Sequence, residues 1–282
     1  MPEGDTVWRQ ARDLNAALAG QLLTGCDFRV PSLATVDFAG STVQSVQARG
    51  KHLLMHVRGL SPDAAWVIHS HLAMEGHWDI YGSAANGRPP RWRRPAHTAR
   101  AILTTEHAVA VGFSLGTLDV LTEKEAGNAV GHLGPDLLGP DWDAAEALRR
   151  LTSAPERPVG LALLDQRNLA GIGNIYRNEL CFLGRVHPDT PVADVPGLPR
   201  LVGLAKQLLE VNKDRAVRST TGGPARRDAA LWVYGLAGRP CKRCGAVVRH
   251  GRQADPAAPT HAARDIYWCP HCQPDPPPPA SS

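Results

Sequence analysis

Four of the six cysteines in this 282-residue chain form two pairs of identical spacing near its C-terminal end. Cys241 and Cys244 make the first pair, Cys269 and Cys272 make the second, and residues 245–268 separate them. Two such turns present four thiolates to one ion, the tetrahedral arrangement that Zn²⁺ prefers. Because sulfur would fill every coordination position, the sequence predicts one structural zinc ion in a small ribbon. Reduced cysteines that share this spacing by coincidence are the alternative.

The positive charge of the chain lies in the same region. Residues 200–273 contain 13 basic and five acidic residues, whereas residues 1–199 contain 18 basic and 21 acidic ones. A basic C-terminal third is expected to contact a polyanion such as the phosphates of a nucleic acid. Alone, the ribbon and this charge support only a nucleic-acid-binding module.

The first half of the chain has the pattern of a β-rich domain. Apolar residues at helical spacing predict a helix over residues 6–19, with Asp5 or Thr6 as its N-cap and Gly20 as its end. Short β-type runs then cover residues 43–48, 53–57, 66–69, 78–81, 101–104, 109–111 and 117–121. Many short strands without alternating helices favour a β-sandwich or a barrel. We expect an N-terminal β-sandwich domain with an N-terminal helix over residues 1–130.

The second half changes to helical periodicity. A Gly- and Pro-rich stretch at 131–140 predicts a linker, and helices are expected over residues 144–151, 159–164, 175–182 and 198–211. These helices define a domain at 141–236, followed by the ribbon, a β-hairpin, at 237–273. The proline-rich residues 274–282 predict a disordered tail. The expected fold is therefore α+β and multidomain.

The first residues offer a nucleophile beside a carboxylate. Removal of Met1 would leave Pro2 with a secondary α-amine, and α-amines have a pKa of about 8. A neutral amine can attack an electrophilic sugar carbon and form an iminium ion, with Glu3 as an adjacent general acid or base. Alternatively, Pro2 and Glu3 simply begin the first helix.

Four motifs in order along the chain carry a resemblance to one family. They are Met1–Thr6 (MPEGDT), Arg49–Leu54 (RGKHLL), Leu164–Gln166 with Gly171–Tyr176 (GIGNIY), and Tyr267–Gln273 (YWCPHCQ). Together they resemble the formamidopyrimidine-DNA glycosylase and endonuclease VIII family of bifunctional DNA repair enzymes. The first and last motifs are most similar to endonuclease VIII of the actinobacterial type. The resemblance covers residues 1 to about 273.

The resemblance implies four catalytic residues. Pro2 matches the nucleophile that attacks C1′ of the damaged nucleotide, and Glu3 matches the acid that protonates the opening deoxyribose. Lys51 is similar to the lysine that contacts phosphate and assists β-elimination. Arg264 resembles the ribbon arginine that grips the phosphate beside the lesion and aids δ-elimination.

The resemblance also implies further contacts with DNA. Asn174 matches a phosphate-binding asparagine in the turn of a helix-two-turn-helix motif, and His71 resembles a phosphate-contacting histidine. Met74 is similar to the apolar residue that fills the gap left by a flipped base. The alternatives are a strand lysine at 51, an asparagine that caps a helix opening at Ile175, a surface histidine and a core methionine. The other histidines are expected to be structural.

The implied function is that of a DNA glycosylase and AP lyase of base excision repair. Its expected partner is double-stranded DNA with an oxidised base or an abasic site, and no organic cofactor is expected. The loop Phe113–Thr117 (FSLGT) lacks the arginine with which the formamidopyrimidine branch pairs the orphaned base, which favours oxidised pyrimidines over 8-oxoguanine. An abasic-site lyase with weak glycosylase activity and a non-catalytic damage-binding protein are the alternatives.

The sequence also bears on location and assembly. No apolar run is long enough to span a bilayer, and the first residues lack the basic and apolar segments of a secretory signal. We therefore expect a monomer in the bacterial cytosol, at the nucleoid, with reduced thiols and no membrane partner.

Overall fold

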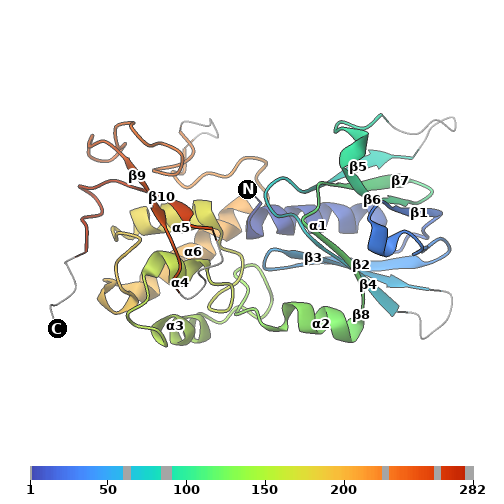
Figure 1. Ribbon diagram of the computed structural model, residues 1–282, viewed down its shortest axis with the longest axis horizontal. Helices are drawn as coiled ribbons and strands as arrows, with labels where there is room; N and C mark the ends of the chain where they lie inside the picture. The colour runs from blue at the N-terminus through green and yellow to red at the C-terminus, as the bar shows by residue number, and fades with distance from the viewer. Residues whose placement is uncertain (1, 60–64, 84–90, 224–228, 257–261, 277–282) are drawn as a thin grey trace. The chain divides into compact units, whose positions relative to one another are not determined.

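The chain folds into two compact units, Met1–His132 and Leu133–Ser282, in the computed structural model (Figure 1). The structure describes residues 2–59, 65–83, 91–223, 229–256 and 262–276. Met1 and residues 277–282 lie outside these ranges, so the expectations of a removable Met1 and of a disordered tail beyond residue 276 do too.

The described strands of the first unit form two four-stranded antiparallel sheets. One sheet has the order β1 (Gly25–Phe28), β6 (Ala99–Thr104), β7 (Ala108–Phe113) and β5 (His77–Gly82). The other has the order β2 (Thr42–Arg49), β3 (His52–Arg58), β4 (Ala65–His71) and β8 (Thr117–Thr122). Buried apolar residues of both sheets join those of one helix in a single core. The predicted sandwich with an N-terminal helix is confirmed, and every expected β-run falls within a strand.

Helix α1 (Gly4–Leu18) begins earlier than the sequence suggested. Its N-cap is Glu3, which has an extended backbone and whose carbonyl accepts hydrogen bonds from the N–H groups of Thr6 and Val7 at 2.9 and 3.0 Å. The prediction of Asp5 or Thr6 as the N-cap was wrong, because both residues are already helical. The buried stripe of α1 runs from Val7 to Leu18 and faces the core of the sandwich.

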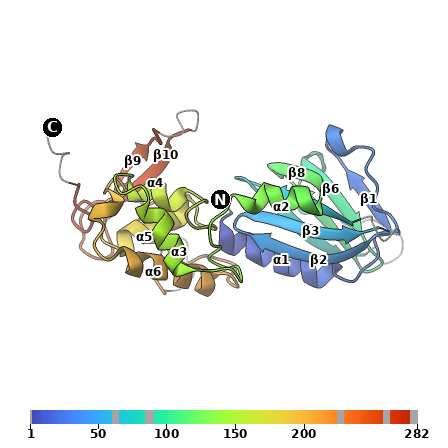
Figure 2. The same ribbon diagram turned by 90° about the horizontal axis from the view of Figure 1, so that it is seen from below.

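Helix α2 (Glu123–Gly131) and strand β1 were not predicted. A capping box starts α2: Thr122 Oγ1 accepts from the backbone N–H of Glu125, whose carboxylate accepts from the backbone N–H of Thr122. Ala126 of α2 packs with Leu54 and Val67 of the β2-β3-β4-β8 sheet (Figure 2). This contact explains why β3 and β4 have buried apolar residues on both faces.

The second unit contains the predicted helices. They are α3 (Ala144–Thr152), α4 (Val159–Leu164), α5 (Asn174–Leu183) and α6 (Leu198–Asn212). Their apolar faces form a second core. Strands β9 (Arg249–Gln253) and β10 (Arg264–Trp268) form the antiparallel hairpin of the expected ribbon. Short 3₁₀ turns occur at η1 (Pro31–Leu33), η3 (Ala96–Thr98) and η4 (Val192–Asp194). None of the helices in the described ranges has the length and hydropathy needed to cross a membrane.

Candidate functional site

The residues singled out from the sequence divide between the two units. Pro2, Glu3, Lys51, His71 and Met74 belong to the first unit. Asn174, Arg264 and the four paired cysteines belong to the second.

Pro2 and Glu3 lie at the N-terminal end of α1. Pro2 is half-buried, and Glu3 is fully buried. The N-terminus of a helix carries a partial positive charge, so a carboxylate at this position is electrostatically favoured. The chain therefore places a shielded carboxyl group directly beside the residue whose nitrogen becomes the N-terminal amine when Met1 is removed.

Lys51 lies in the tight turn between β2 and β3. Arg49 and His52 pair across the two strands, and Gly50 adopts φ +58°, a left-handed conformation that glycine reaches without steric cost. Lys51 directly precedes His52, which pairs with His71 across the sheet. Burial, followed by the positive charge of Lys51, lowers the pKa of His71. The strand register therefore places the Lys51 turn beside the strand end that carries His71.

Three histidines of neighbouring strands form a cluster, defined here as His52, His69 and His71. His52 pairs across the sheet with His71, their rings lie 5.2 Å apart, and His52 Nδ1 is 2.9 Å from His69 Nε2. His69 Nδ1 lies 3.4 Å from the carboxylate of Asp119 on β8. His52 and His69 were expected to be structural. The signal that could have revealed the cluster is that His52 follows Lys51 at the start of one β-run, and His69 and His71 lie two residues apart at the end of the next.

Burial is the main cause of the electrostatics of this cluster. Burial, followed by the nearby charges of His71, His69, His132 and Lys51, lowers the pKa of His52 to about 3. Burial lowers the pKa of His69 too, although Asp119 opposes this effect. The ring of His52 is therefore neutral at neutral pH, and it accepts or donates hydrogen bonds without repelling a cation.

Met74 lies in the loop that follows β4. Its side chain is 60% exposed, so it is not the core methionine of the alternative interpretation. Contact with water is unfavourable for an apolar side chain, and the flexible, unbranched methionine can adapt to an apolar gap.

Asn174 is the first residue of α5, and Gly173 is the N-cap. The interpretation of Asn174 as a cap for a helix opening at Ile175 is therefore wrong. Its side chain is 5% exposed and points toward the ribbon: Nδ2 donates to the Asp265 carbonyl at 3.0 Å, and Oδ1 accepts from Arg177. The helix start and strand β10 are thus joined by a hydrogen bond between residues far apart in the sequence.

Arg177 and Asn178 strengthen the same junction. The fully buried Arg177 donates to Gln253 and, at 2.9 Å, to the Asp265 carbonyl. Asn178 Oδ1 accepts from the Tyr267 N–H at 2.7 Å. These contacts fix the strand in which Arg264, an exposed residue, stands immediately before Asp265. A rigid anchor of this kind limits the space that the long Arg264 side chain samples.

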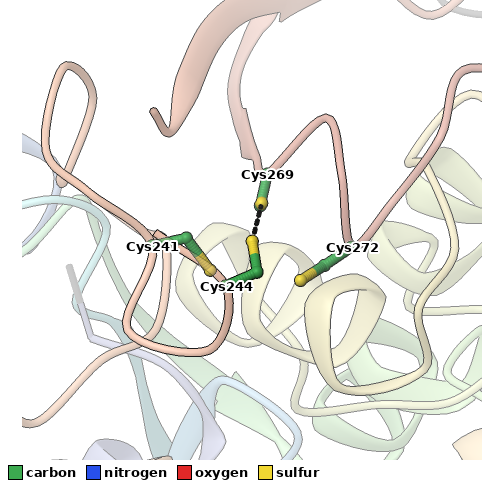
Figure 3. Close-up of side chains that lie close together, drawn as sticks. All are labelled: Cys241, Cys244, Cys269 and Cys272. Carbon is green, nitrogen blue, oxygen red and sulfur yellow. Dashed lines mark hydrogen bonds between the residues drawn. The ribbon is translucent and has the colours of Figure 1, made fainter. Parts of the chain in front are cut away.

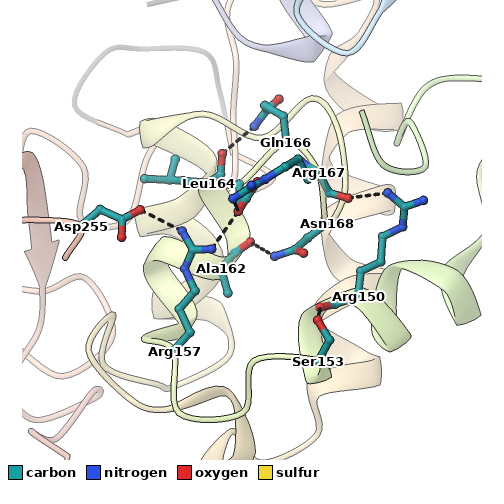
Figure 4. Close-up of polar contacts among 10 residues, drawn as sticks. Arg150, Ser153, Arg157, Ala162, Leu164, Gln166, Arg167, Asn168 and Asp255 are labelled. Carbon is teal, nitrogen blue, oxygen red and sulfur yellow. Dashed lines mark hydrogen bonds and ion pairs between the residues drawn. The ribbon is translucent and has the colours of Figure 1, made fainter. Parts of the chain in front are cut away.

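The turn between α4 and α5 is held by side chains from distant positions (Figure 4). Arg157 donates to Asp165 and to Asp255, each at 2.8 Å. Gln166 Nε2 donates to the Leu164 and Ile172 carbonyls at 2.8 and 2.9 Å. Further contacts join Arg150 to the Arg167 carbonyl and Asn168 to the Ala162 carbonyl. The network fixes the backbone that leads into Asn174.

We expect Asp165→Asn to weaken the second unit in a pH-dependent way. Burial raises the pKa of Asp165, but hydrogen bonds from Arg167 and Arg157 outweigh it and lower the pKa to about 2. A lowered pKa means that the carboxylate stabilises the fold above the unfolded value of about 4 and ceases to do so as the pH falls toward 2. Urea unfolding should show a loss of about 1–2 kcal/mol at pH 6 that shrinks to about a third of that value near pH 2.5, where the folded-state carboxylate is still mostly ionised.

The matched control is Asp194→Asn, which removes an exposed carboxylate from η4 of the same unit. It should change the free energy of unfolding by less than about 0.5 kcal/mol at either pH. An Asp165→Asn deficit that stays constant between pH 6 and pH 2.5 would contradict the role of the charged carboxylate.

The four paired cysteines converge at one point of the second unit (Figure 3). Their sulfur atoms all lie within 4.8 Å of one another, and those of Cys244 and Cys269 are 3.4 Å apart. Zn–S bonds of about 2.3 Å in a tetrahedron give S–S edges of about 3.8 Å, so the spacing fits one such ion. Gly245 (φ +82°) closes the first turn by donating to the Cys241 carbonyl at 2.8 Å. The residues present therefore suit a closed metal site.

Two family models match the chain. That of the formamidopyrimidine-DNA glycosylase N-terminal domain matches residues 1–114, and that of the formamidopyrimidine-DNA glycosylase H2TH domain matches residues 133–221.

Curated relatives match over nearly the full length. "Probable endonuclease 8 2" of Streptomyces coelicolor is 53% identical over 99% of this chain and 96% of its own. A "DNA-(apurinic or apyrimidinic site) lyase" of Mycolicibacterium smegmatis is 44% identical over 97% of this chain and 99% of its own. Among solved structures, a complex of Lactococcus lactis formamidopyrimidine-DNA glycosylase with DNA containing an oxidised pyrimidine has a TM-score of 0.76 at 23% identity. It aligns with 97% of this chain and 100% of that one. This last likeness shows the fold.

Proposed function

The chain belongs to the formamidopyrimidine-DNA glycosylase and endonuclease VIII family of DNA glycosylases with AP lyase activity. We therefore propose that it removes oxidised bases, pyrimidines in particular, through a Schiff base at Pro2 followed by β,δ-elimination. The observation that carries the proposal is the complete burial of Glu3, the residue that follows Pro2 at the start of α1. The proposed partner is double-stranded DNA, contacted by a single chain in the cytosol.

The proposed reaction uses the Pro2 amine and the Glu3 carboxyl group in turn. The neutral Pro2 nitrogen attacks C1′, the bond from C1′ to the damaged base breaks, and the base leaves with the proton that the attacking nitrogen gives up. Glu3 protonates the ring oxygen as the deoxyribose opens, which yields an iminium ion between Pro2 and C1′. Loss of a C2′ proton then expels the 3′ phosphate, and a second elimination expels the 5′ phosphate. Hydrolysis of the iminium frees Pro2.

Phosphate contacts are proposed to orient the sugar. Lys51, from its turn beside the histidine cluster, assists the first elimination, and Arg264, from the anchored start of β10, assists the second. Asn174 lies at the N-terminus of α5, where backbone N–H groups point outward and favour a phosphate. Such contacts position the backbone without reading its sequence, which suits an enzyme that inspects all DNA.

The proposed metal is zinc. The closed set of four sulfur donors suits Zn²⁺ in a structural site, where it would hold the two turns together. The reacting groups named above are all side chains or the N-terminal amine, so the chemistry requires no organic cofactor.

The preference for pyrimidines is proposed from the loop Phe113–Thr117. No residue of this loop is an arginine, and its Leu115 is partly buried and packs against the core. A Cβ at Gly112 would lie 2.7 Å from its methyl group and 3.1 Å from the Trp78 ring, so Leu115 folds inward over these residues. A loop without an arginine, whose leucine packs inward, supports weak discrimination between opposite bases.

The test compares three duplexes under single-turnover conditions, each with the same sequence and a thymine glycol, an 8-oxoguanine or an abasic site. We expect the thymine glycol to be excised at least about tenfold faster than 8-oxoguanine, equivalent to about 1.4 kcal/mol in the barrier. Borohydride should trap a covalent adduct on the thymine glycol and abasic duplexes. Cleavage of the abasic duplex alone would support an abasic-site lyase, and binding without any adduct would support a damage-binding protein.

A further inference from the structure

The loop that carries Met74 begins with a hydrogen bond from the backbone to a histidine ring. The N–H of Ala73 donates to Nδ1 of His71 at 3.1 Å. Ala73 adopts φ +52°, a left-handed conformation that is sterically unfavourable for a residue with a Cβ. Ala73 therefore needs a contact that stabilises the bend, and the His71 ring supplies one immediately before Met74.

The loop at 113–117 supports the same bend from the other side. Gly116 donates its N–H to the His71 carbonyl at 2.9 Å, and a Cβ at Gly116 would collide with the Ala73 side chain. Ser114 in this loop is also left-handed, with φ +47°. Two bent loops thus pack backbone against backbone, and this arrangement leaves Met74 as the exposed large apolar residue of the loop.

The His71 ring is itself held in place. His52 lies against it edge to face, and the 2.9 Å contact of His52 with His69 fixes the orientation of the His52 ring. Asp119, on the next strand, lies 3.4 Å from the far nitrogen of His69. A chain of contacts therefore runs across β8, β4 and β3 to the ring that supports the turn.

The charges around His71 favour the neutral ring. Burial, then Lys51 in the β2–β3 turn, then His69 lower the pKa of His71. The neighbouring His52 has its own pKa lowered to about 3, and its surroundings include His132 beyond α2. A neutral His71 whose Nδ1 accepts from Ala73 carries its proton on Nε2.

We propose that His71 is a positioning residue for Met74, because its Nδ1 fixes the turn that presents Met74 to the gap in a base stack. The Nε2–H of the same ring then remains the donor toward a phosphate oxygen. This inference rests on the proposed function, in which Met74 fills the place of the flipped nucleotide. His71 would thus link the contact with a DNA phosphate to the position of the Met74 side chain.

Two substitutions separate the nitrogens of the ring. His71→Asn places an acceptor where Nδ1 lies, and an asparagine side chain readily accepts from the N–H two residues later. His71→Gln places an amide N–H near the position of Nε2 but removes the acceptor for the Ala73 N–H. The probe is a duplex with a tetrahydrofuran abasic analogue beside 2-aminopurine, whose fluorescence rises when it unstacks. Met74→Ala gives the fluorescence expected when no apolar side chain fills the gap in the base stack.

We expect His71→Asn to retain the fluorescence rise of the wild type while its Kd increases about fivefold, the effect of one lost hydrogen bond. His71→Gln should reduce the rise about threefold or more, toward the Met74→Ala level. Adding Ala73→Gly to His71→Gln should recover part of the rise, since glycine adopts the bend without the histidine. Equal loss of signal in His71→Asn and His71→Gln, or no loss in either, would overturn the positioning role.

Trapping with borohydride on the natural abasic duplex separates this inference from the function on which it rests. If the wild-type protein forms the adduct but the fluorescence rise is the same in the wild type and in the His71 variants, only this inference is overturned. Absence of the adduct in the wild-type protein would overturn the proposed function itself.

Discussion

A protein whose N-terminal amine is blocked is expected to lose the borohydride-trapped adduct with abasic DNA. A chain extended by two residues before Pro2 converts the proposed nucleophile into an amide nitrogen, which cannot form an iminium ion. Because the attack depends on a neutral amine held beside C1′, the rate of adduct formation should fall at least about a thousandfold. Gel separation of the trapped complex measures this rate, and intact mass confirms the N-terminal residue of each protein.

Glu3→Gln is the matched control for that experiment. It leaves the Pro2 amine intact and replaces a buried carboxyl group by an amide of similar shape. The adduct with a preformed abasic site should persist, whereas excision of thymine glycol should fall about a hundredfold through loss of the general acid. Undiminished trapping by the extended chain would refute Pro2 as the nucleophile. Pro2→Gly, which replaces the secondary amine by a primary one, should weaken trapping.

Local sequence patterns predicted much of the fold because they reflect local physics. The alternating burial of β6, the continuous apolar run of β7 and the buried stripe of α1 arise from side chains within one strand or helix, and these patterns are visible in the sequence. The Cys-x2-Cys pairs likewise encode their own turns. Helix α2 was missed although the Thr122 and Glu125 capping box is a local signal, because its apolar face is short and packs on Leu54 and Val67.

The contacts that position the candidate site could not be predicted in this way, because they join distant parts of the chain. Asn174 donates to a carbonyl of Asp265, a backbone atom with no side-chain signature. The histidine cluster depends on the register that places His52 opposite His71, and a shift by one residue would send these rings to the other face. The resemblance to the family indicated Asn174 and His71, and the structure adds the hydrogen bonds and ring contacts that fix their side chains.

The junction between Asp265 and α5 makes the cysteine cluster the other point at which a single change should have a large effect. We expect Cys269→Ser to release the metal and to unfold the β9–β10 hairpin. Binding of zinc to finger peptides contributes about 10–16 kcal/mol, which the short hairpin cannot supply from its own packing. The loss of the hairpin would also leave the buried Arg177 without the Asp265 and Gln253 acceptors, and a buried charge without partners is strongly destabilising.

Unfolding of the hairpin should also weaken DNA binding, because the strand that carries Arg264 would no longer be fixed. Affinity for an abasic duplex should fall at least about a hundredfold, and hydrogen exchange across residues 249–253 and 264–268 should lose its protection. Cys26→Ser, at a half-buried cysteine of the first unit, is the control and should retain the metal, the protection and the affinity. The structural role of the metal predicts that a chelator reproduces the Cys269→Ser phenotype and that added zinc reverses it. A chelated protein that keeps both hairpin protection and DNA affinity would show that protein contacts alone hold Arg264 in place.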